Sequence, residues 1–170
     1  MKGFNKLEVI DNSLIRKTAN PYADRDRLKR ELKISRKFRH RGLIRAIDWK
    51  KDEEIVIYYP YYRYPTLSQV IKEGIHRKRF SFLLKYIIRV LQESDLYHGD
   101  LNCQNILVTE DPENPVILID FEFSTFGAKI EEDLHFLLST CASLLELQPC
   151  RNYDFTLKTE NISLWIKKII

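Results

Sequence analysis

The stretch that decides the fold of this chain is H-G-D-L-N-C-Q-N, which runs from His98 to Asn105. Two short apolar runs follow it, residues 106–109 and 116–119, and the segment between them contains only Glu, Asp, Pro and Asn. Apolar runs around such a turn-forming cluster predict a β-hairpin. The triplet Asp120-Phe121-Glu122 comes directly after the second run.

This hairpin would gather oxygen-bearing side chains at one end. In an antiparallel pair, the residue before the first strand lies beside the residue after the second. We therefore expect the side-chain oxygens of Asn105 and Asp120 to lie within about 5 Å of each other, close enough to share one metal ion. Asp100 lies on the loop that leads into the hairpin. Two carboxylates and an amide suit Mg²⁺, and the chemistry that most needs Mg²⁺ beside a carboxylate is phosphoryl transfer.

At this point the chain resembles a known superfamily. H-G-D-L-N-C-Q-N-I-L-V followed by L-I-D-F-E resembles the catalytic loop and metal-binding triplet of protein-kinase-like proteins. The resemblance implies a single α+β domain with the two-lobe kinase fold, the N-lobe over residues 1–60 and the C-lobe over 61–170. It also implies transfer of the γ-phosphoryl of ATP to a hydroxyl, with Asp100 handling the proton and Asn105 and Asp120 holding Mg²⁺.

The upstream sequence resembles the same superfamily. Residues 13–17 resemble the strand whose lysine holds the α- and β-phosphates, and residues 30–44 resemble the helix whose glutamate pairs with that lysine. This implies that Lys17 binds phosphate and that Glu31 holds Lys17 in place. Arg16 is the rival, because adjacent strand residues point to opposite faces and only one of the two can face the cleft. The compact charge of lysine favours Lys17.

The segment after residue 54 resembles the strand and hinge that join the two lobes. Pro60 ends the predicted strand, and residues 61–65 form the predicted hinge. The resemblance implies that the backbone here binds adenine, which makes the cofactor-binding candidates Tyr58, Tyr59, Pro60 and Tyr61. The hinge tyrosines either stack on adenine or fill the core between the lobes, and the sequence leaves both interpretations open.

The chain departs from the family pattern in several places. Gly3 is the only glycine ahead of the lysine strand, so the glycine-rich loop is short, replaced or absent. Only about ten residues separate Asp120 from the next helix near Glu131, too few for a peptide-seating segment. Gly99 replaces the arginine that protein kinases carry beside the catalytic Asp, and Glu122 replaces the last glycine of D-F-G. We therefore expect a minimal fold with a reduced N-lobe and a truncated C-lobe.

These departures favour a small-molecule or glycan acceptor over a protein. The acidic third residue resembles choline and aminoglycoside kinases, and D-L-N-x-x-N-I-L resembles the lipopolysaccharide-core sugar kinases. The chain is also similar to a small bacterial kinase-like family regulated by the PhoP network. A lipopolysaccharide-core sugar is thus one candidate acceptor. A protein Ser/Thr kinase is the first alternative, and a non-catalytic nucleotide-binding regulator, favoured by the missing glycine loop, is the second.

Composition sets the remaining limits. Of the 170 residues, 44% are hydrophobic, and no apolar run approaches the length of a membrane span. The first residues do not resemble a signal peptide. The three cysteines are odd in number and lack C-x-x-C spacing, so we expect reduced thiols in the cytoplasm and no structural zinc. Cys103 is interpreted as a small packing residue. Peripheral attachment at the inner face of the membrane is compatible with this cytoplasmic assignment.

Positive charge is concentrated in one predicted helix. Residues 24–41 hold nine Arg or Lys and three acids, while the whole chain carries a net charge of +4. This helix either presents a solvated face or docks on an anionic membrane or glycan. Nucleic acid is the least favoured partner, because no RNA-reading motif accompanies the charge. Since Glu31 must face inward, we expect the following side chains to be exposed as one patch: Arg25, Lys29, Lys33, Arg36 and Lys37.

Apolar periodicity predicts the other elements. A hairpin over residues 6–18 should turn at Asp11-Asn12. An apolar stripe predicts a helix over 80–96, and further helices are predicted to start at Thr66 and to cover 133–147 and 162–170.

Overall fold

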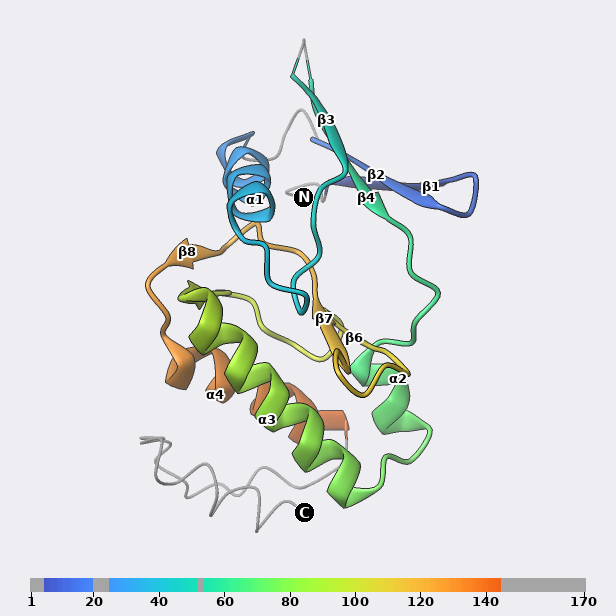
Figure 1. Cartoon of the computed structure of the whole chain (residues 1–170), viewed down its shortest axis with the longest axis vertical. Coiled ribbons are helices and arrows are strands. Elements are labelled where there is room, and N and C mark those ends of the chain that lie inside the picture. Colours follow the sequence, from blue (N-terminus) through green and yellow to red (C-terminus); the bar gives the residue numbers. More distant parts are fainter. Residues whose placement is uncertain (1–4, 20–24, 52–53, 145–170) are drawn as a thin grey trace.

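The computed structural model describes residues 5–19, 25–51 and 54–144 and has a mixed α+β fold (Figure 1). One end of the molecule is a four-stranded antiparallel sheet in the order β1-β2-β4-β3, with a single helix, α1, packed beside it. Its elements are β1 (Lys6–Ile10), β2 (Leu14–Thr18), α1 (Arg25–Lys37), β3 (Asp48–Lys51) and β4 (Ile55–Pro60).

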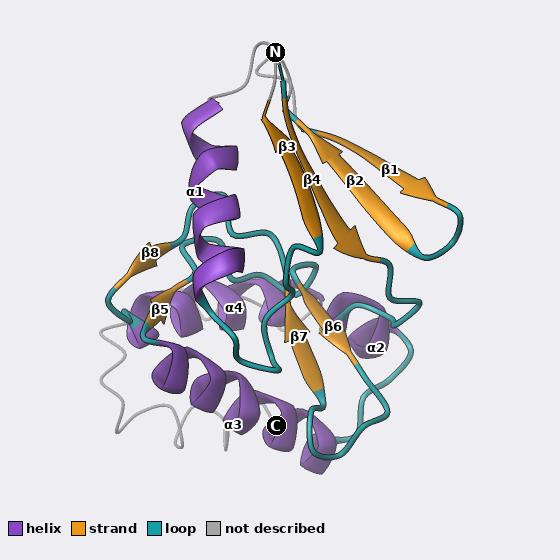
Figure 2. Ribbon diagram, turned by 45° about the horizontal axis from the view of Figure 1, so that its top comes forward, coloured by secondary structure: helices purple, strands orange, loops and turns teal. Residues whose placement is uncertain are grey.

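The other end is mainly helical (Figure 2). Its helices are α2 (Leu67–Lys72), α3 (Arg77–Ser94) and α4 (Ile130–Leu144). Two short antiparallel pairs lie among them: β5 (Leu96–Tyr97) with β8 (Thr125–Phe126), and β6 (Ile106–Val108) with β7 (Val116–Leu118). The β6–β7 pair is the predicted hairpin, and its register sets Ile106 opposite Leu118. The strand ends at residues 105 and 119 therefore meet, as the sequence predicted.

Two local turns also confirm the sequence analysis. Asp11 and Asn12 are the central residues of the turn between β1 and β2, which the Ser13 N–H closes by donating to the Ile10 carbonyl at 3.2 Å. Their φ values of 51° and 55° are left-handed, a conformation that Asp and Asn tolerate. Thr66 begins α2 with a capping box, because its side chain accepts from the backbone N–H of Gln69 and the Gln69 side chain accepts from the Thr66 N–H.

Some boundaries differ from the prediction for clear physical reasons. Helix α3 begins at Arg77, three residues before the predicted start. The prediction missed these residues because they are all basic and show no apolar periodicity. The His76 side chain caps the helix by accepting from the Lys78 N–H. Strand β3 was not predicted, since Trp49 is its only apolar residue. The predicted helix over 162–170 lies outside the described residues.

A single hydrophobic core joins these elements. The predicted stripe of α3 is buried, with Leu83, Leu84, Ile87 and Leu91 at 2% exposure or less, and α3 contacts α4. Cys103, in the loop before β6, is buried in this core, in agreement with its interpretation as a packing residue. In the part of the chain that the structure describes, no helix is both long and apolar enough to cross a membrane.

Candidate active site

The centre of the site is the Lys17 ammonium, which β2 directs into the interior. Lys17 Nζ lies 2.7 Å from Glu31 Oε2, 2.9 Å from Asp120 Oδ1 and 2.8 Å from Glu122 Oε1. The Tyr59 hydroxyl donates to the other oxygen of Glu31 at 2.9 Å. Strand β2, helix α1 and the segment after β7 thus meet at one buried cation. Arg16 points to the other face of β2, where it approaches Glu8.

This cluster has more negative than positive charge. The carboxylates of Glu31, Asp120 and Glu122 offer oxygens within 4.8 Å of one another, and Lys17 is the cation that they share. Burial alone would lower the pKa of Lys17, but the three carboxylates outweigh it and raise this pKa above its ordinary value. Burial raises the pKa of Glu31 to about 7, against the opposing effect of Lys17. A further cation would therefore be stabilised here.

A matched pair of substitutions tests the role of Lys17. Lys17→Met should lower nucleotide affinity roughly tenfold or more, because a hydrogen bond to a charged group contributes about 1.5–3 kcal/mol. Arg16→Met removes the neighbouring cation of the same strand and should leave this affinity nearly unchanged. Calorimetric titration with a non-hydrolysable ATP analogue measures both, and circular dichroism confirms that each variant is folded. An equal loss of nucleotide affinity in the two variants would contradict the prediction that Lys17, and not Arg16, binds phosphate.

The Asp100 carboxylate is held by the loop that follows it. The Asn105 side-chain amide donates to Asp100 Oδ2 at 3.0 Å and to the Asp100 carbonyl at 2.9 Å. The Asn102 amide lies 3.3 Å from Asp100 Oδ1. Partial burial raises the pKa of Asp100 above its ordinary value, with these two amides opposing the shift. A partly exposed carboxylate whose orientation is fixed by amides suits a group that accepts a proton.

The hairpin brings Asn105 and Asp120 to the same strand end. The Ile119 N–H donates to the Asn105 carbonyl at 3.0 Å, so the two predicted metal ligands are attached to hydrogen-bonded backbone positions. Asp120 has a left-handed backbone with φ of 66°, and its carboxylate contacts Lys17. Asn105 uses its side-chain amide nitrogen on Asp100, so its side-chain carbonyl oxygen is the atom available to the predicted metal ion. The expected spacing between the oxygens of Asn105 and Asp120 stays a prediction.

Sequence analysis missed the side chain that anchors the loop carrying Asp100. Asp133, near the start of α4, accepts from the backbone N–H of His98 at 2.8 Å and from that of Gly99 at 2.9 Å. Asp133 is 1% exposed, and burial raises its pKa to about 6 against these two hydrogen bonds. The Ser124 hydroxyl donates to the His98 carbonyl at 2.8 Å. In the sequence, Asp133 looks like an ordinary acidic residue in the first turn of a helix.

Gly99 is required by the packing of this loop. Its φ is 76°, and a Cβ atom at this position would lie 2.6 Å from the carbonyl oxygen of Phe123. No side chain fits there without moving the segment after Asp120. The glycine that stands where protein kinases carry arginine is therefore a steric necessity in this structure.

His98 is a fully buried, neutral histidine. Its Nε2 lies 3.0 Å from the Ile119 carbonyl, so Nε2 carries the proton, and Nδ1 has no hydrogen-bond partner among the described residues. Burial lowers the pKa of His98 to about 4.

This histidine predicts an acid-sensitive contribution to stability. The unfolded chain binds a proton at His98 near pH 6.5 and the folded chain only near pH 4, so stability falls as the pH is lowered through this window. Relative to His98→Gln, whose amide can still donate to Ile119, the wild type should lose on the order of 3 kcal/mol between pH 7 and 4. Urea unfolding of both proteins across this range measures the difference. A constant difference would mean that folding does not lower the pKa of His98.

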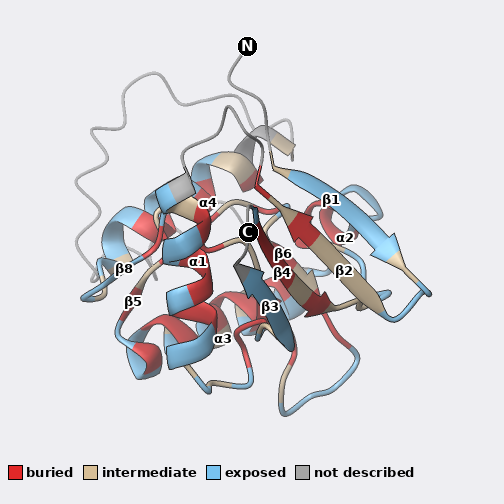
Figure 3. Cartoon of the chain, turned by 90° about the horizontal axis from the view of Figure 1, so that it is seen from above, coloured by how far each residue is buried: buried red, intermediate tan, exposed pale blue. Residues whose placement is uncertain are grey.

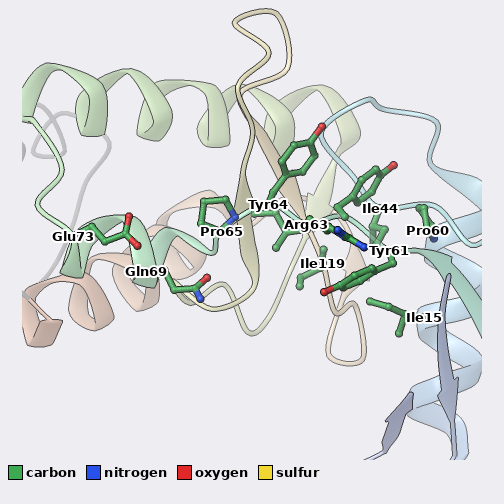
Figure 4. Close-up of a pocket in the computed structure, with 12 residues that line it drawn as sticks. Ile15, Ile44, Pro60, Tyr61, Arg63, Tyr64, Pro65, Gln69, Glu73 and Ile119 are labelled. Carbon is green, nitrogen blue, oxygen red and sulfur yellow. The ribbon is translucent and has the colours of Figure 1, made fainter. Parts of the chain in front are cut away.

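A pocket of about 580 Å³ lies between β2, the segment that leads from β4 to α2, and the β6–β7 hairpin (Figure 4). Apolar side chains line it from both ends of the molecule: Ile15 of β2, two residues before Lys17, and Ile119, directly before Asp120, with Ile44 and Leu107. A flat apolar ligand would fit between such walls.

Two of the four predicted adenine-binding residues line this pocket and two do not. Pro60 and Tyr61 line the pocket, together with the segment 62–65 that leads to α2. Tyr58 and Tyr59 lie outside its lining: the Tyr58 carbonyl accepts from the Ile47 N–H, and the Tyr59 side chain turns to Glu31. Tyr62 and Tyr64 stack on each other, with ring centroids 5.6 Å apart.

The described residues form a mixed α+β fold in which Lys17, Glu31, Asp120 and Glu122 meet at one buried cluster. In the comparison with known proteins, residues 71–153 match the family model described as the ecdysteroid kinase-like family. The match covers just under half of the chain and includes Asp100, Asn105, Asp120 and Asp133. It supports a kinase at the level of class. A search of curated proteins finds no match. The likenesses to sugar, choline and aminoglycoside kinases stay predictions.

Proposed function

We propose that the protein transfers the γ-phosphoryl group of ATP to a hydroxyl group of a small molecule or glycan, with Mg²⁺ as cofactor. The observation that carries the proposal is the buried Lys17–Glu31 ion pair at 2.7 Å, joined to Asp120 at 2.9 Å. It links a strand, a helix and the triplet after the hairpin through the residue types that phosphoryl transfer uses. The Lys17 ammonium would bind nucleotide phosphates, with Glu31 fixing its position.

The residues present fit a divalent cation. The cluster around Lys17 contains three carboxylates for one ammonium, and this surplus negative charge favours a cation. Asp120 and the carbonyl oxygen of Asn105 would hold Mg²⁺, which when bound neutralises phosphate charge. The apolar pocket would receive adenine between Ile15 and Leu107.

In this proposal Asp100 accepts the proton of the attacking hydroxyl. Asn105 and Asn102 orient its carboxylate, and the backbone before it is fixed by Asp133. The acceptor would approach from the solvent side of Asp100, which is partly exposed. A small acceptor is favoured because α4 begins at Ile130, ten residues after Asp120, which leaves little chain to seat a peptide. The name of the matching family also points to a small molecule.

A screen of acceptors tests the proposal directly. The purified chain is incubated with Mg-ATP and sugars, amino alcohols, lipopolysaccharide-core fragments or a generic protein substrate, and ADP release is measured. We expect release with a sugar or amino alcohol that depends on Mg²⁺. Transfer to protein alone would favour a protein Ser/Thr kinase. Nucleotide binding without ADP release in any mixture would favour a non-catalytic regulator.

A further inference from the structure

The outer side of α1 carries unpaired positive charge. Lys33, Arg36 and Lys37 are exposed, and Arg36 and Lys37 lie three and four residues after Lys33, so both neighbour Lys33 on the outer side of the helix. Within the described ranges no acidic side chain pairs with them, whereas Lys29 pairs with Asp26 at 2.7 Å. The predicted exposure is confirmed for Lys29, Lys33, Arg36 and Lys37; the side chain of Arg25 lies outside the described residues. Figure 3 shows the buried and exposed sides of α1.

Exposed aromatic rings flank these cations on both sides. Phe126 of β8 and Trp49 of β3 are 40% and 37% exposed, and α1 lies between these two strands (Figures 1 and 2). Lys37 Nζ lies 3.8 Å from the Phe126 ring centroid, and Arg36 Cζ lies 5.2 Å from that of Trp49. Phe123 is 41% exposed beneath Arg27. We name the following set the basic–aromatic face: Lys33, Arg36, Lys37, Trp49, Phe123 and Phe126.

The chemistry of this face matches an anionic lipid surface. Lys and Arg attract anionic headgroups, and aromatic rings favour the headgroup level of a bilayer, where one side is apolar and the other wet. A nucleic acid would need open ring faces on which bases could stack. Here the faces of Phe126 and Trp49 are already approached by Lys37 and Arg36. A soluble polyanion would gain nothing from the exposed rings.

We propose that the basic–aromatic face docks the protein on a membrane surface rich in anionic phospholipid. The carbonyl of Phe123, on this face, packs against Gly99, the residue before Asp100. Docking would therefore bring the active-site loop close to the bilayer. This last step rests on the proposed function and makes a lipid-linked hydroxyl compound the acceptor class that the site could reach.

Vesicle sedimentation tests the docking separately from catalysis. The full chain is mixed, without nucleotide, with phosphatidylcholine vesicles that contain or lack phosphatidylserine. We expect binding only with phosphatidylserine, weakening steeply as salt is raised toward about 0.15 M, where charges are screened over roughly 8 Å. Asp100→Asn should bind equally well, so a failure of the kinase proposal leaves this result unaffected. Equal binding to both vesicle types would overturn the docking proposal.

Two sets of variants locate the binding face. The triple variant Lys33→Glu, Arg36→Glu, Lys37→Glu should lose on the order of 100-fold in vesicle partitioning, because each basic residue near such a surface contributes attraction. The triple variant Lys72→Glu, Lys78→Glu, Arg79→Glu makes the same change in net charge with exposed residues of α2 and α3 and should bind almost normally. Equal losses would mean that net charge alone drives binding, which would overturn the proposal.

The rings distinguish a membrane from a soluble polyanion. The double variant Trp49→Ser, Phe126→Ser should weaken binding to phosphatidylserine vesicles while leaving binding to dextran sulfate unchanged. In a Trp165→Phe background, the emission of Trp49 should shift to shorter wavelength when vesicles are added, as the ring enters a less polar layer. No shift together with equal binding of the ring variant would place the rings outside the interface and overturn the membrane assignment.

Discussion

Asp100→Asn is expected to lower phosphoryl transfer by a factor on the order of 10² or more, with nucleotide affinity nearly unchanged. The asparagine has almost the same shape, and its one side-chain oxygen can still accept from the Asn105 amide, while the longer contact with Asn102 is lost. What it loses is the ability to accept the proton of the attacking hydroxyl. Single-turnover measurement of ADP formation gives the rate of transfer, and titration with a non-hydrolysable ATP analogue gives the affinity.

Asp111→Asn is the matched control for this substitution. Asp111 lies in the β6–β7 turn, at the opposite end of the hairpin from Asn105, and is exposed. The Asp111→Asn variant should transfer phosphate at the wild-type rate. Undiminished turnover by Asp100→Asn, with binding verified, would show that the Asp100 carboxylate has only a structural role.

Asp133→Ala is expected to have the largest effect on stability. It removes the only side chain bonded to the backbone N–H groups of His98 and Gly99 in the part of the chain that the structure describes. An unsatisfied buried donor costs about 1–3 kcal/mol, so two should lower the free energy of unfolding by about 2–6 kcal/mol. Activity should fall as well, because Asp100 directly follows the freed backbone. Urea unfolding followed by circular dichroism measures the change.

Glu132, the residue before Asp133, provides the control substitution. Glu132→Ala removes an exposed carboxylate that pairs with Lys129 at 3.2 Å, and surface pairs contribute little. The free energy of unfolding of this variant should stay close to that of the wild type. If both variants lost the same amount, the effect would belong to the first turn of α4 and the anchoring role of Asp133 would be rejected.

Local patterns predicted the elements that carry the chemistry. The β6–β7 hairpin, the Asp11-Asn12 turn and the core stripe of α3 all follow from short-range rules of period and turn chemistry. Each feature depends on residues that are close together in the sequence, so the local sequence alone is enough to predict it. Strand β3 lacked such a pattern, because its pairing with β4 depends on position in the sheet more than on its own apolar content.

Local sequence patterns could not predict the long-range contacts of the site. Asp133 bonds to residues more than thirty positions earlier, and nothing in its surroundings distinguishes it from Glu131 or Glu132. Glu122 was identified as a departure from D-F-G, but its contact with Lys17 became visible only with the fold. Strand alternation predicted that only one of Arg16 and Lys17 faces the cleft, the compact charge of lysine favoured Lys17, and the structure directs Lys17 inward.

The close packing of Gly99 has a consequence for control of the enzyme. A phosphate-sensing switch needs a cation beside the catalytic carboxylate, and here the Phe123 carbonyl fills the space that such a side chain would occupy. The segment after Asp120 is also tied down, because the N–H groups of Gly127 and Ala128 donate to Asp95. We therefore expect no phosphorylation-dependent ordering of this loop, and adding such control would require lengthening the segment after Asp120 as well as replacing Gly99.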